Sequence, residues 1–463
     1  MVRDHKINLN NVKNIHMIGI GGSGIFPIAK ILSDKGFYVS GSDSTESETT
    51  QRAENSGIKV FIGHNPENVD NADLVVFSAA IKENNPEIQR AREKGIPCLQ
   101  RSTMLGIITD EYKNSVAVSG THGKTSTTSM ITHILLDSHK EPTAIIGGTL
   151  PRIRGNSCMG KSDIIVCEAC EYVDSFLELH PRIAIILNVD ADHLDYFKSI
   201  EGVKSSFSKF AEQTKDILIV NGDDGNACEC AGDAKCKKIY FGLSDKSDYH
   251  AKNIQFDEFQ AASFDLFYDK QFIVHVDLNI PGKHNVYNAM AAIIVCLELG
   301  VRPGDISESI KTFKGAHRRF EILDTVGAVT IADDFAHHPS EIEATLTAAK
   351  SMNFKRVILV FQPHTFSRTF MFLDEFAKSL SLADRVILTD ILPVREVNTY
   401  DIYSEDLGQR IENCICVGTF DNAVSEVLNT AKPGDLVLTM GGGNIYKCAN
   451  MIVSEMKNKF RDK

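Results

Sequence analysis

The chain has 463 residues, of which 43% are apolar and 24% are charged, and its formal net charge at pH 7 is −12. This composition is typical of a soluble globular protein with two or three domains, and the negative charge disfavours a nucleic-acid partner. No apolar stretch is long enough for a transmembrane helix, and residues 1–6 are polar and lack the apolar core of a signal peptide. We therefore expect a cytoplasmic protein without membrane insertion. The 11 cysteines match no disulfide or zinc framework and are expected to be reduced thiols.

The first predicted strand and helix are joined by a glycine-rich turn. The apolar residues 15–18 run into Gly19-Ile20-Gly21-Gly22-Ser23-Gly24, and residues 25–32 have the composition of a helix. Further strands are predicted at residues 37–40 and 74–77. The G-x-G-x-x-G pattern is typical of a pyrophosphate bound at a helix N-terminus, and NAD is the commonest such ligand. Two interpretations of Asp43 stay open, a ligand of the nucleotide and a solvated turn residue.

A second glycine-rich turn is the most informative stretch of the chain. Gly120-Thr121-His122-Gly123-Lys124-Thr125 follows the apolar residues 116–118 and precedes a predicted helix at residues 126–136. In such a loop the backbone N–H groups surround phosphate oxygens, the lysine reaches the β- and γ-phosphates and the threonine hydroxyl holds Mg²⁺. The loop is a shortened form, G-x-x-G-K-T, because Val118 stands where the common phosphate loop has its first glycine. The stretch predicts an ATP site.

Glu168 and His193 follow the next two predicted strands of this middle block. Residues 164–167 form a strand that ends at Glu168, and residues 183–187 form a strand that ends shortly before His193. In an open parallel sheet these positions lie at the carboxyl edge, where ligands bind. Because Mg²⁺ prefers carboxylate oxygen, Glu168 is the stronger candidate metal ligand, and a structural role is the alternative for His193.

The rest of the middle block is less regular. Glu171 and Asp192 have helix capping as an alternative to a role in the site. Residues 215–277 contain short apolar runs separated by turn residues, which predicts an antiparallel addition to the sheet. A helix rich in alanine is predicted at residues 288–299.

The last block again alternates apolar strands with helix-like segments. Strands are predicted at residues 329–332, 356–361, 385–388 and 436–439. The polar cluster at residues 333–339 precedes a helix that starts with a proline, and Arg318 and Arg319 lie at the start of the block. The alternation in all three blocks predicts an α/β protein with parallel sheets. The predicted domains are residues 1–112, 113–320 and 321–463.

The presence of two predicted phosphate-binding turns in one chain limits the classes of enzyme to which it can belong. A chain with a dinucleotide-like turn and an ATP-like loop is best interpreted as an enzyme that uses ATP on a nucleotide-activated substrate. The pyrophosphate at the first turn would then belong to a sugar nucleotide. An NAD-linked oxidoreductase is the alternative from a different class, and failure to bind ATP would favour it.

In their order along the chain, these motifs resemble those of the Mur ligases, the ATP-dependent amide-forming enzymes of peptidoglycan assembly. The resemblance covers essentially the whole chain and is carried by residues 16–24, 120–126, 168–171, 188–195, 284–289, 318–321, 333–339 and 361–364. It implies a Rossmann-like UDP-sugar domain, a central P-loop-type ATPase domain and a C-terminal Rossmann-like domain that brings the amino acid.

The resemblance also implies the residues of each subsite. Those of the UDP-sugar are Gly19, Gly21, Gly22, Ser23, Gly24, Asp43, His64 and Ser78. Those of ATP are Gly120, Thr121, His122, Gly123, Lys124, Thr125, Ser126, His284, Asn285, Asn288, Arg319 and Asp334. Those of Mg²⁺ are Thr125, Glu168 and His193. His338, His364 and Arg368 match the region that receives the amino acid, and they complete a catalytic set with Lys124, Glu168 and His193.

Three positions depart from the usual motifs of the family. Cys170 stands where relatives have aspartate, Phe335 where they have tyrosine, and Thr365 where they often have arginine. These replacements concern the amino-acid pocket more than the ATP chemistry.

The reaction implied by the resemblance joins L-alanine to UDP-N-acetylmuramate through an acyl phosphate, with ATP and Mg²⁺, in a monomer or homodimer. Two further interpretations share most of the motifs: a ligase that attaches a recycled murein tripeptide to the same sugar nucleotide, and a catalytically silent relative. The intact Lys124, Thr125, Glu168 and His193 argue against a silent relative.

Overall fold

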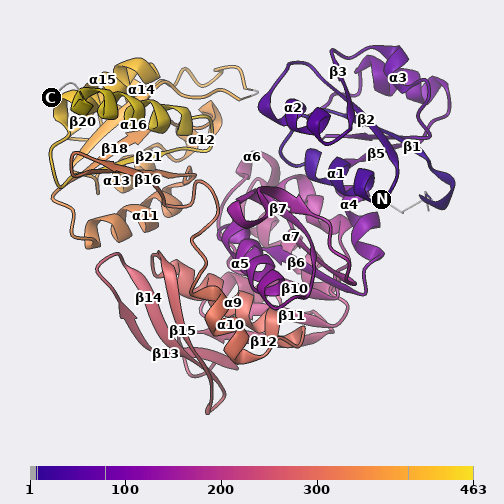
Figure 1. Cartoon of the computed structure of the whole chain (residues 1–463), viewed down its shortest axis with the longest axis horizontal. Helices are drawn as coiled ribbons and strands as arrows, with labels where there is room; N and C mark the ends of the chain where they lie inside the picture. The colour runs from indigo at the N-terminus through magenta and orange to yellow at the C-terminus, as the bar shows by residue number, and fades with distance from the viewer. Residues whose placement is uncertain (1–6, 8, 79, 395, 462–463) are drawn as a thin grey trace. The chain divides into compact units, whose positions relative to one another are not determined.

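The computed structural model describes residues 7, 9–78, 80–394 and 396–461 (Figure 1). The polar residues 1–6, on which the prediction of no signal peptide depended, lie outside this range. Among the helices described, none combines the length and the apolar character needed to cross a membrane. The strands form three sheets, and the predicted α/β class with parallel-rich sheets is confirmed.

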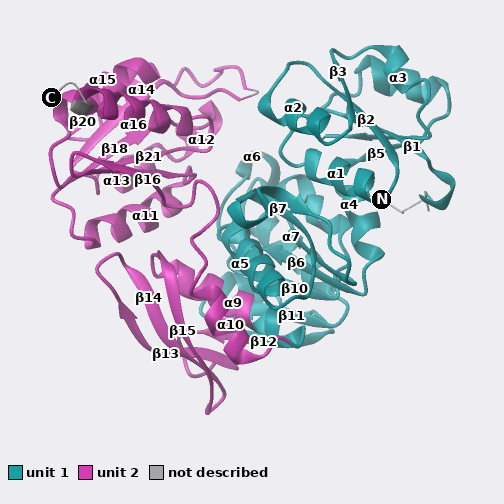
Figure 2. Ribbon diagram, viewed as in Figure 1, with its two compact units in different colours: residues 1–240, 294–300 teal, residues 241–293, 301–463 magenta. Residues whose placement is uncertain are grey.

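The chain divides into two compact units (Figure 2). Unit 1 comprises residues 1–240 and 294–300, and unit 2 comprises residues 241–293 and 301–463. The division therefore runs inside the strand β12 (Lys237–Gly242) and inside the helix α9 (His284–Glu298). The domain boundaries after residues 112 and 320 stay a prediction.

The first sheet of unit 1 is parallel, with the strand order β3-β2-β1-β4-β5. Its strands are β1 (Asn14–Ile18), β2 (Tyr38–Asp43), β3 (Lys59–Ile62), β4 (Leu74–Phe77) and β5 (Cys98–Gln100). Its helices are α1 (Phe26–Asp34), α2 (Glu48–Asn55), α3 (Pro86–Glu93) and α4 (Arg101–Asp110). Strands β2 and β3 lie on one side of β1, and β4 and β5 lie on the other, so the strand order reverses at β1. In α/β sheets ligands bind at such a point, outside the carboxyl ends of the strands.

In the second sheet of unit 1 the strands follow the order β11-β10-β6-β9-β7-β8. The strands are β6 (Asn114–Ser119), β7 (Thr143–Leu150), β8 (Gly155–Cys158), β9 (Ile164–Glu168), β10 (Ile183–Ile186) and β11 (Ile217–Asn221). The helices are α5 (Lys124–Asp137), α6 (Leu194–Phe197), α7 (Ile200–Glu212) and α8 (Gly225–Cys230). Strands β6, β9 and β10 are parallel and almost wholly buried, which explains their uninterrupted apolar runs. Because β6 lies between β9 and β10, the residues that follow these three strands share one edge.

The antiparallel addition predicted at residues 215–277 is only partly correct. β11 is parallel to β10, and β12 is parallel to β13 (Tyr249–Phe256). Antiparallel pairing begins with β13 and continues through β14 (Ala261–Tyr268) and β15 (Gln271–Pro281). Burial alternates along β14 and β15, as it does in strands with one covered face, whereas β11 is buried throughout. Within residues 215–277, continuous burial therefore marks the parallel strand β11, and alternating burial marks the antiparallel strands β14 and β15.

Unit 2 contains a sheet with the strand order β16-β17-β21-β18-β19-β20. The strands are β16 (Glu321–Val326), β17 (Val329–Asp334), β18 (Val357–Phe361), β19 (Arg385–Thr389), β20 (Cys414–Gly418) and β21 (Leu436–Met440). The helices are α10 (Pro303–Ile310), α11 (Pro339–Ser351), α12 (Phe366–Met371), α13 (Leu373–Leu380), α14 (Ser404–Gly408), α15 (Phe420–Thr430) and α16 (Tyr446–Arg461). Only β16 is antiparallel to its neighbour, and separate apolar clusters cover the sheet. The carboxyl ends of β17, β21 and β18 are adjacent.

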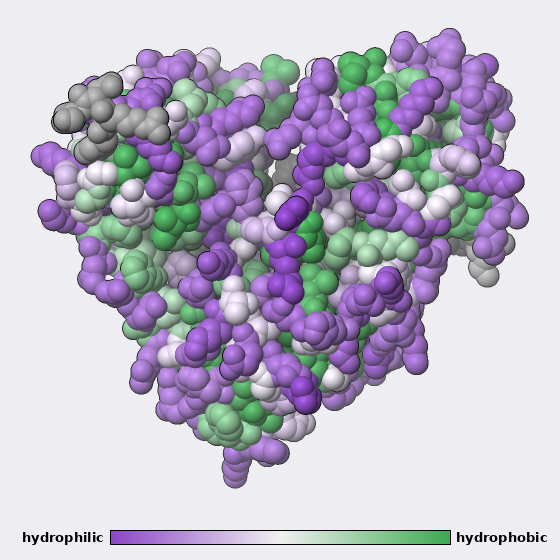
Figure 3. All heavy atoms as spheres, viewed as in Figure 1, coloured by the Kyte–Doolittle hydropathy of each residue, from purple (hydrophilic) through white to green (hydrophobic). Residues whose placement is uncertain are grey.

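The 3₁₀ helices are short: η1 (Leu9–Asn11), η2 (Pro66–Val69), η3 (Pro151–Ile153) and η4 (Tyr172–Glu178). On the face shown in Figure 3, hydrophilic side chains cover most of the surface and apolar ones lie between them. All 11 cysteines are free thiols in the structure.

Candidate active site

The phosphate loop of unit 1 adopts the predicted strand–turn–helix geometry. β6 ends at Ser119, the loop runs through Gly120 and Gly123, and α5 begins at Lys124. Gly120 has φ +139° and Gly123 has φ +85°, which side-chain-bearing residues rarely adopt. A Cβ on Gly120 would also lie 2.9 Å from the Cβ of Leu187, at the end of β10. The two glycines therefore allow the loop to turn tightly between β6 and α5.

Lys124 is held by an ion pair at the start of α5. Its Nζ lies 3.0 Å from Oε1 and 2.9 Å from Oε2 of Glu171, and it also donates to the carbonyl of Thr121 at 3.0 Å. Burial lowers the pKa of Lys124, but the Glu171 carboxylate and other negative groups outweigh it, and the pKa is raised overall. Lys124 is therefore a buried cation beside the loop.

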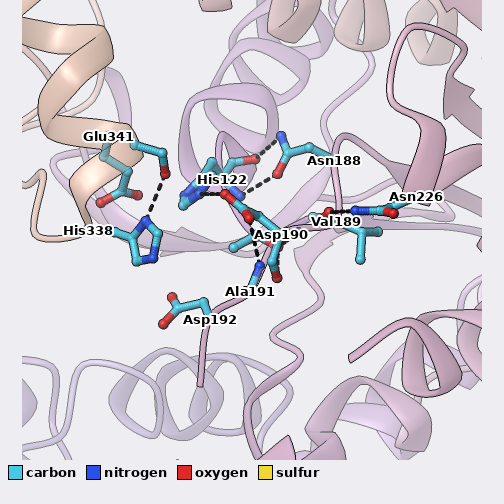
Figure 4. A network of polar contacts seen from close by, with 12 residues as sticks. His122, Asn188, Val189, Asp190, Ala191, Asp192, Asn226, His338 and Glu341 are labelled. Atoms are coloured by element: carbon cyan, nitrogen blue, oxygen red, sulfur yellow. Dashed lines mark hydrogen bonds and ion pairs between the residues drawn. The ribbon is translucent and has the colours of Figure 1, made fainter. Parts of the chain in front are cut away.

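Asn188 fastens the phosphate loop to the end of β10 (Figure 4). The N–H of His122 donates to Oδ1 of Asn188 at 2.8 Å, and Nδ2 of Asn188 donates to the carbonyl of His122 at 3.1 Å. The N–H of Asp190 donates to the hydroxyl of Thr121 at 2.9 Å, and the ring of His122 lies 3.7 Å from the carboxylate of Asp190. Because Asn188 forms hydrogen bonds with both the N–H and the carbonyl of His122, it fixes the orientation of the loop backbone.

The candidate metal ligands follow neighbouring strands. Glu168 ends β9, and its Oε1 accepts a hydrogen bond from the N–H of Gly147 at 2.5 Å. Thr125 is the second residue of α5, and Ser126 follows it. His193 has φ +54° and its ring lies 4.7 Å from that of Tyr172. The hydroxyl and carboxylate oxygens of Thr125 and Glu168 suit Mg²⁺. In the described part of the chain, no three-ligand cluster of acidic, histidine or cysteine residues joins Glu168 with His193.

The capping interpretation is wrong for Glu171, whereas the carboxylate of Asp192 does accept an N–H at the start of α6. Glu171 precedes η4, but its side chain makes no capping hydrogen bond and pairs with Lys124 instead. The residue at the cap position of α6 is His193, whose own N–H donates to Oδ1 of Asp192 at 2.7 Å. The sequence alone did not separate these roles, because an acidic residue before a short helix fits both.

The first glycine turn connects β1 to α1. The N–H groups of Gly19 and Ile20 donate to the carbonyl of Ser42 at 2.8 and 3.0 Å. The N–H of Gly21 donates to Oδ2 of Asp43 at 2.9 Å, and a Cβ on Gly21 would come within 2.8 Å of that oxygen. A Cβ on Gly19 would lie 3.4 Å from that of Ser78. The structure therefore brings Gly19, Gly21, Asp43 and Ser78 together, and Asp43 closes the turn.

The rest of this turn contacts the second sheet of unit 1. The carbonyl of Ser23 accepts a hydrogen bond from Nδ2 of Asn156, in β8, at 3.0 Å. The N–H of Gly22 donates to the carbonyl of Gly19 at 3.0 Å, and Gly24 lies against Arg101. The sequence motif includes all of these glycines but carries no sign of Asn156 or Arg101.

Below the turn, His64 belongs to a network centred on Glu87. Oε2 of Glu87 lies 2.9 Å from Nδ1 of His64 and accepts the hydroxyl of Ser42 at 2.6 Å, while Oε1 accepts Nδ2 of Asn68 at 2.6 Å. Oε1 also lies 3.5 Å from Nε2 of His16. Burial raises the pKa of Glu87, but the hydrogen bonds from His16, Ser42 and Asn68 outweigh it and lower the pKa overall. Glu87 is a buried anion that fixes His64 and Ser42, and no sequence motif marks it.

In unit 2, the predicted ATP residues begin with the first turn of α9. Nδ2 of Asn285 donates to the carbonyl of Pro281 at 2.7 Å, and Nδ2 of Asn288 donates to Oδ1 of Asn285 at 2.9 Å. Gly282 has φ +100°, and a Cβ there would lie 2.5 Å from the ring of His284. The motif therefore forms one compact turn, in which Asn285 orders the start of the helix.

Asp334 and Arg319 lie together at the end of β17. The carboxylate of Asp334 accepts the N–H groups of Phe320 and Ala336, both at 2.7 Å. Burial raises the pKa of Asp334 to about 6, although the nearby Arg319 opposes the rise. The guanidinium of Arg319 lies over the ring of Phe335, 5.2 Å from its centre. Phe335, which replaces the usual tyrosine, is thus a stacking partner for an arginine.

The predicted amino-acid residues belong to the same unit. The ring of His364 lies 5.4 Å from that of His337, and both are close to Gly442, where a Cβ would lie 3.0 Å from His337 and 3.2 Å from His364. Nδ1 of His338 lies 2.7 Å from the hydroxyl of Ser340, and Arg368 is buried in α12. His364 is therefore beside the glycine-rich loop that follows β21.

Arg318 holds that glycine-rich loop in place. Its guanidinium donates to Asp333 and to the carbonyls of Gly441 and Gly443, each at 2.7 Å. Arg318 therefore has a structural role, whereas its neighbour Arg319 is the arginine predicted to contact ATP.

Comparisons with known proteins agree along the whole chain. Three family models match: the Mur ligase family, catalytic domain, at residues 14–113, the Mur ligase middle domain at residues 118–296, and the Mur ligase, glutamate ligase domain, at residues 318–443. The UDP-N-acetylmuramate–L-alanine ligase of Caldanaerobacter subterraneus subsp. tengcongensis is 46% identical over 458 residues, which are 98% of this chain and 100% of the relative.

Solved structures give the same picture. The UDP-N-acetylmuramate–alanine ligase of Thermotoga maritima superposes with a TM-score of 0.82 at 28% identity, covering 97% of this chain and 100% of that one. A murein peptide ligase from Psychrobacter arcticus superposes with a TM-score of 0.75 at 24% identity, covering 96% and 99%, which shows a shared fold.

Proposed function

Because this chain belongs to the Mur ligase family, we propose that it is the ATP-dependent, ADP-forming ligase that joins L-alanine to UDP-N-acetylmuramate in peptidoglycan precursor synthesis. The structural observation that carries the proposal is that unit 1 combines two phosphate-binding turns, the one after β1 and the one after β6. The first suits a sugar nucleotide and the second suits ATP.

The chemistry explains why ATP is needed. The carboxylate of UDP-N-acetylmuramate is a poor electrophile at neutral pH, and transfer of the γ-phosphate to it gives an acyl phosphate with a good leaving group. The amine of alanine then attacks the acyl carbon, and phosphate departs through a tetrahedral oxyanion. The buried cation of Lys124 would offset charge on the transferring phosphoryl group.

The metal ligands are proposed from the motifs and from the chemistry of the donor atoms, and the loop roles from the hydrogen bonds of the two turns. Thr125 and Glu168, with His193 as a further ligand, would hold Mg²⁺, which neutralises charge on ATP phosphates when bound. Asn188 keeps the loop between Gly120 and Gly123 in its binding conformation, and Asn156 and Asp43 keep the first turn in its own.

The amine of alanine must be neutral to attack, so a group must take its proton. His338 and His364 are the candidates, and Arg368 would pair with the amino-acid carboxylate. Both histidines belong to unit 2 together with the glycine-rich loop after β21.

Neither alternative explains the observations as well. An NAD-linked oxidoreductase does not account for the second turn, in which Gly120 and Gly123 have positive φ and Lys124 is held beside Glu171. A murein tripeptide ligase shares the fold, but the relative that is 46% identical over 98% of the chain is an L-alanine ligase. We therefore expect UDP-N-acetylmuramate, L-alanine and ATP as partners in the cytoplasm, and a monomer or homodimer.

The test is the release of phosphate from Mg-ATP with UDP-N-acetylmuramate, adding L-alanine, glycine, L-serine or the murein tripeptide one at a time. We expect release that depends on L-alanine. Lys124→Ala should lower kcat by at least about 100-fold, because it removes the positive charge that would offset the negative charge of the transferring phosphoryl group. Lys35→Ala is the matched control, since Lys35 pairs with Glu111 on the surface.

Other acceptors give the contrary outcomes. Release only with the tripeptide would assign the chain to recycling, and no release with any acceptor would refute ligase activity. Binding of NAD without binding of ATP would favour the oxidoreductase.

A further inference from the structure

Arg101 is a cation beside the first glycine turn that no motif identifies. It is the first residue of α4 and is half-buried. A Cβ on Gly24 would lie 3.5 Å from Cδ and Nε of Arg101 and 3.6 Å from its Cζ. The guanidinium therefore lies along the C-terminal end of the turn that precedes α1.

The position of Arg101 is fixed by the packing of α4. This helix contacts both α1 and η4. At Gly106 the contact with η4 is so close that a Cβ would lie 2.3 Å from the carbonyl oxygen of Glu178. Because α4 cannot shift without losing this contact, Arg101 is presented from a rigid element.

The same guanidinium also acts electrostatically on the end of β9. The positive charge of Arg101 opposes the burial that raises the pKa of both Cys167 and Cys170. Cys170 immediately precedes Glu171, the partner of Lys124. Arg101 thus contacts the first glycine turn and also acts electrostatically on residues at the end of β9.

Among the residues that the structure describes, no hydrogen bond or ion pair engages the guanidinium of Arg101. The acidic side chains at the two turns are committed elsewhere, Asp43 to the N–H of Gly21 and Glu171 to Lys124. An arginine has five N–H donors, and a partly desolvated charge is normally paired. A half-buried arginine that lacks a carboxylate partner beside a glycine turn therefore calls for an anionic ligand.

We propose that Arg101 binds the pyrophosphate of the UDP-sugar, as the side-chain counterpart of the backbone donors of the glycine turn. The inference rests on the proposed function, because it takes a sugar nucleotide as the ligand of this turn. A planar guanidinium suits two phosphate oxygens at once, which a lysine cannot match. The contribution of Arg101 is to ground-state binding of the nucleotide, so it acts on substrate affinity more than on turnover.

The test is the affinity of the full-length protein for UDP, UMP and uridine, measured by calorimetry at constant ionic strength. Arg101→Gln should weaken UDP binding by about 10- to 100-fold and leave uridine binding unchanged. Arg101→Lys should lose part of the affinity, because it keeps the charge but not the planar fork. Arg92→Gln is the matched control, since Arg92 lies in α3 and pairs with the exposed Glu83, and this variant should bind UDP like the wild type.

In the ligase assay, Arg101→Gln should raise KM for UDP-N-acetylmuramate by a similar factor, with kcat and KM for ATP nearly unchanged. Its melting temperature should equal that of the wild type, because no internal hydrogen bond is removed. Unchanged UDP affinity in a folded Arg101→Gln would overturn the inference alone, and a fall in kcat with unchanged UDP affinity would overturn it in favour of a role at the ATP phosphates. A wild-type protein that bound no UDP would overturn the proposed function as well.

Discussion

The ion pair between Lys124 and Glu171 joins stability to nucleotide binding. Both side chains are largely buried, with 16% and 3% of their surface exposed. We predict that Glu171→Gln lowers the free energy of unfolding by about 3 kcal/mol, because it leaves a buried ammonium without its countercharge. Mg-ATP would bring a new anion to Lys124, so the rise in melting temperature on adding Mg-ATP should be larger in the variant than in the wild type.

The control for this prediction is Glu111→Gln. Glu111 pairs with Lys35 at 2.7 Å but is 42% exposed, so its loss should cost no more than about 1 kcal/mol and leave the effect of Mg-ATP unchanged. Equal stabilisation of the Glu171 variant and the wild type by Mg-ATP would show that Glu171 and the triphosphate do not share Lys124.

Single residues were predictable from the sequence only where their neighbours in the chain identify them. Lys124 and Thr125 stand within a contiguous motif whose glycines adopt the expected conformation. Asn188 acts on His122, which is 66 positions away, and Glu87 acts on Ser42, which is 45 positions away. No local pattern marks Asn188, Glu87 or Arg101, because each acquires its role from tertiary contacts.

At the scale of elements, the packing of α4 on η4 can be tested by the sign of a change in the free energy of unfolding. Gly106→Ala would normally stabilise a helix by up to about 1 kcal/mol. Here the added Cβ would lie 2.3 Å from the carbonyl of Glu178, so we expect the free energy of unfolding to fall by about 1 to 3 kcal/mol. Denaturant unfolding monitored by circular dichroism would measure the change.

The matched variant for this test is Gly304→Ala in α10. Nothing lies within 4 Å of a Cβ built on Gly304, so alanine there should be neutral or stabilising. If Gly106→Ala were stabilising as well, the close contact between α4 and η4 would not exist in solution.

The strands predicted best from the sequence are those that are almost wholly buried, because burial requires an uninterrupted run of apolar residues. The predicted strand at residues 74–77 has the bounds of β4, and the strands β9, β10 and β18 were found nearly whole. Strands β3, β8 and β20 escaped prediction, since each lies at an edge of its sheet and its residues are largely half-exposed or polar. The start of α9 was placed four residues late, because the polar His284 and Asn285 conceal the first turn.

At the scale of the whole molecule, the sequence predicted three α/β blocks in order but not the division into two units. Alternating strands and helices in the sequence mark blocks that are contiguous along the chain. The division does not follow the chain, since residues 294–300 belong with unit 1 after residues 241–293 have contributed to unit 2. Only contacts between distant segments reveal such an arrangement.

This connectivity predicts where the chain can be cut. A fragment of residues 1–240 lacks Ile294 and Val295, which are fully buried and belong with unit 1. Burial of two such side chains contributes about 3 to 6 kcal/mol, a large part of the stability of a typical domain. We expect the fragment 1–300, which retains α9, to melt cooperatively and bind UDP, and the fragment 1–240 to melt at lower temperature with weaker UDP binding or to aggregate. Equal melting temperatures and UDP affinities for the two fragments would show that residues 294–300 do not stabilise unit 1, and that the strands up to β12 form its complete core.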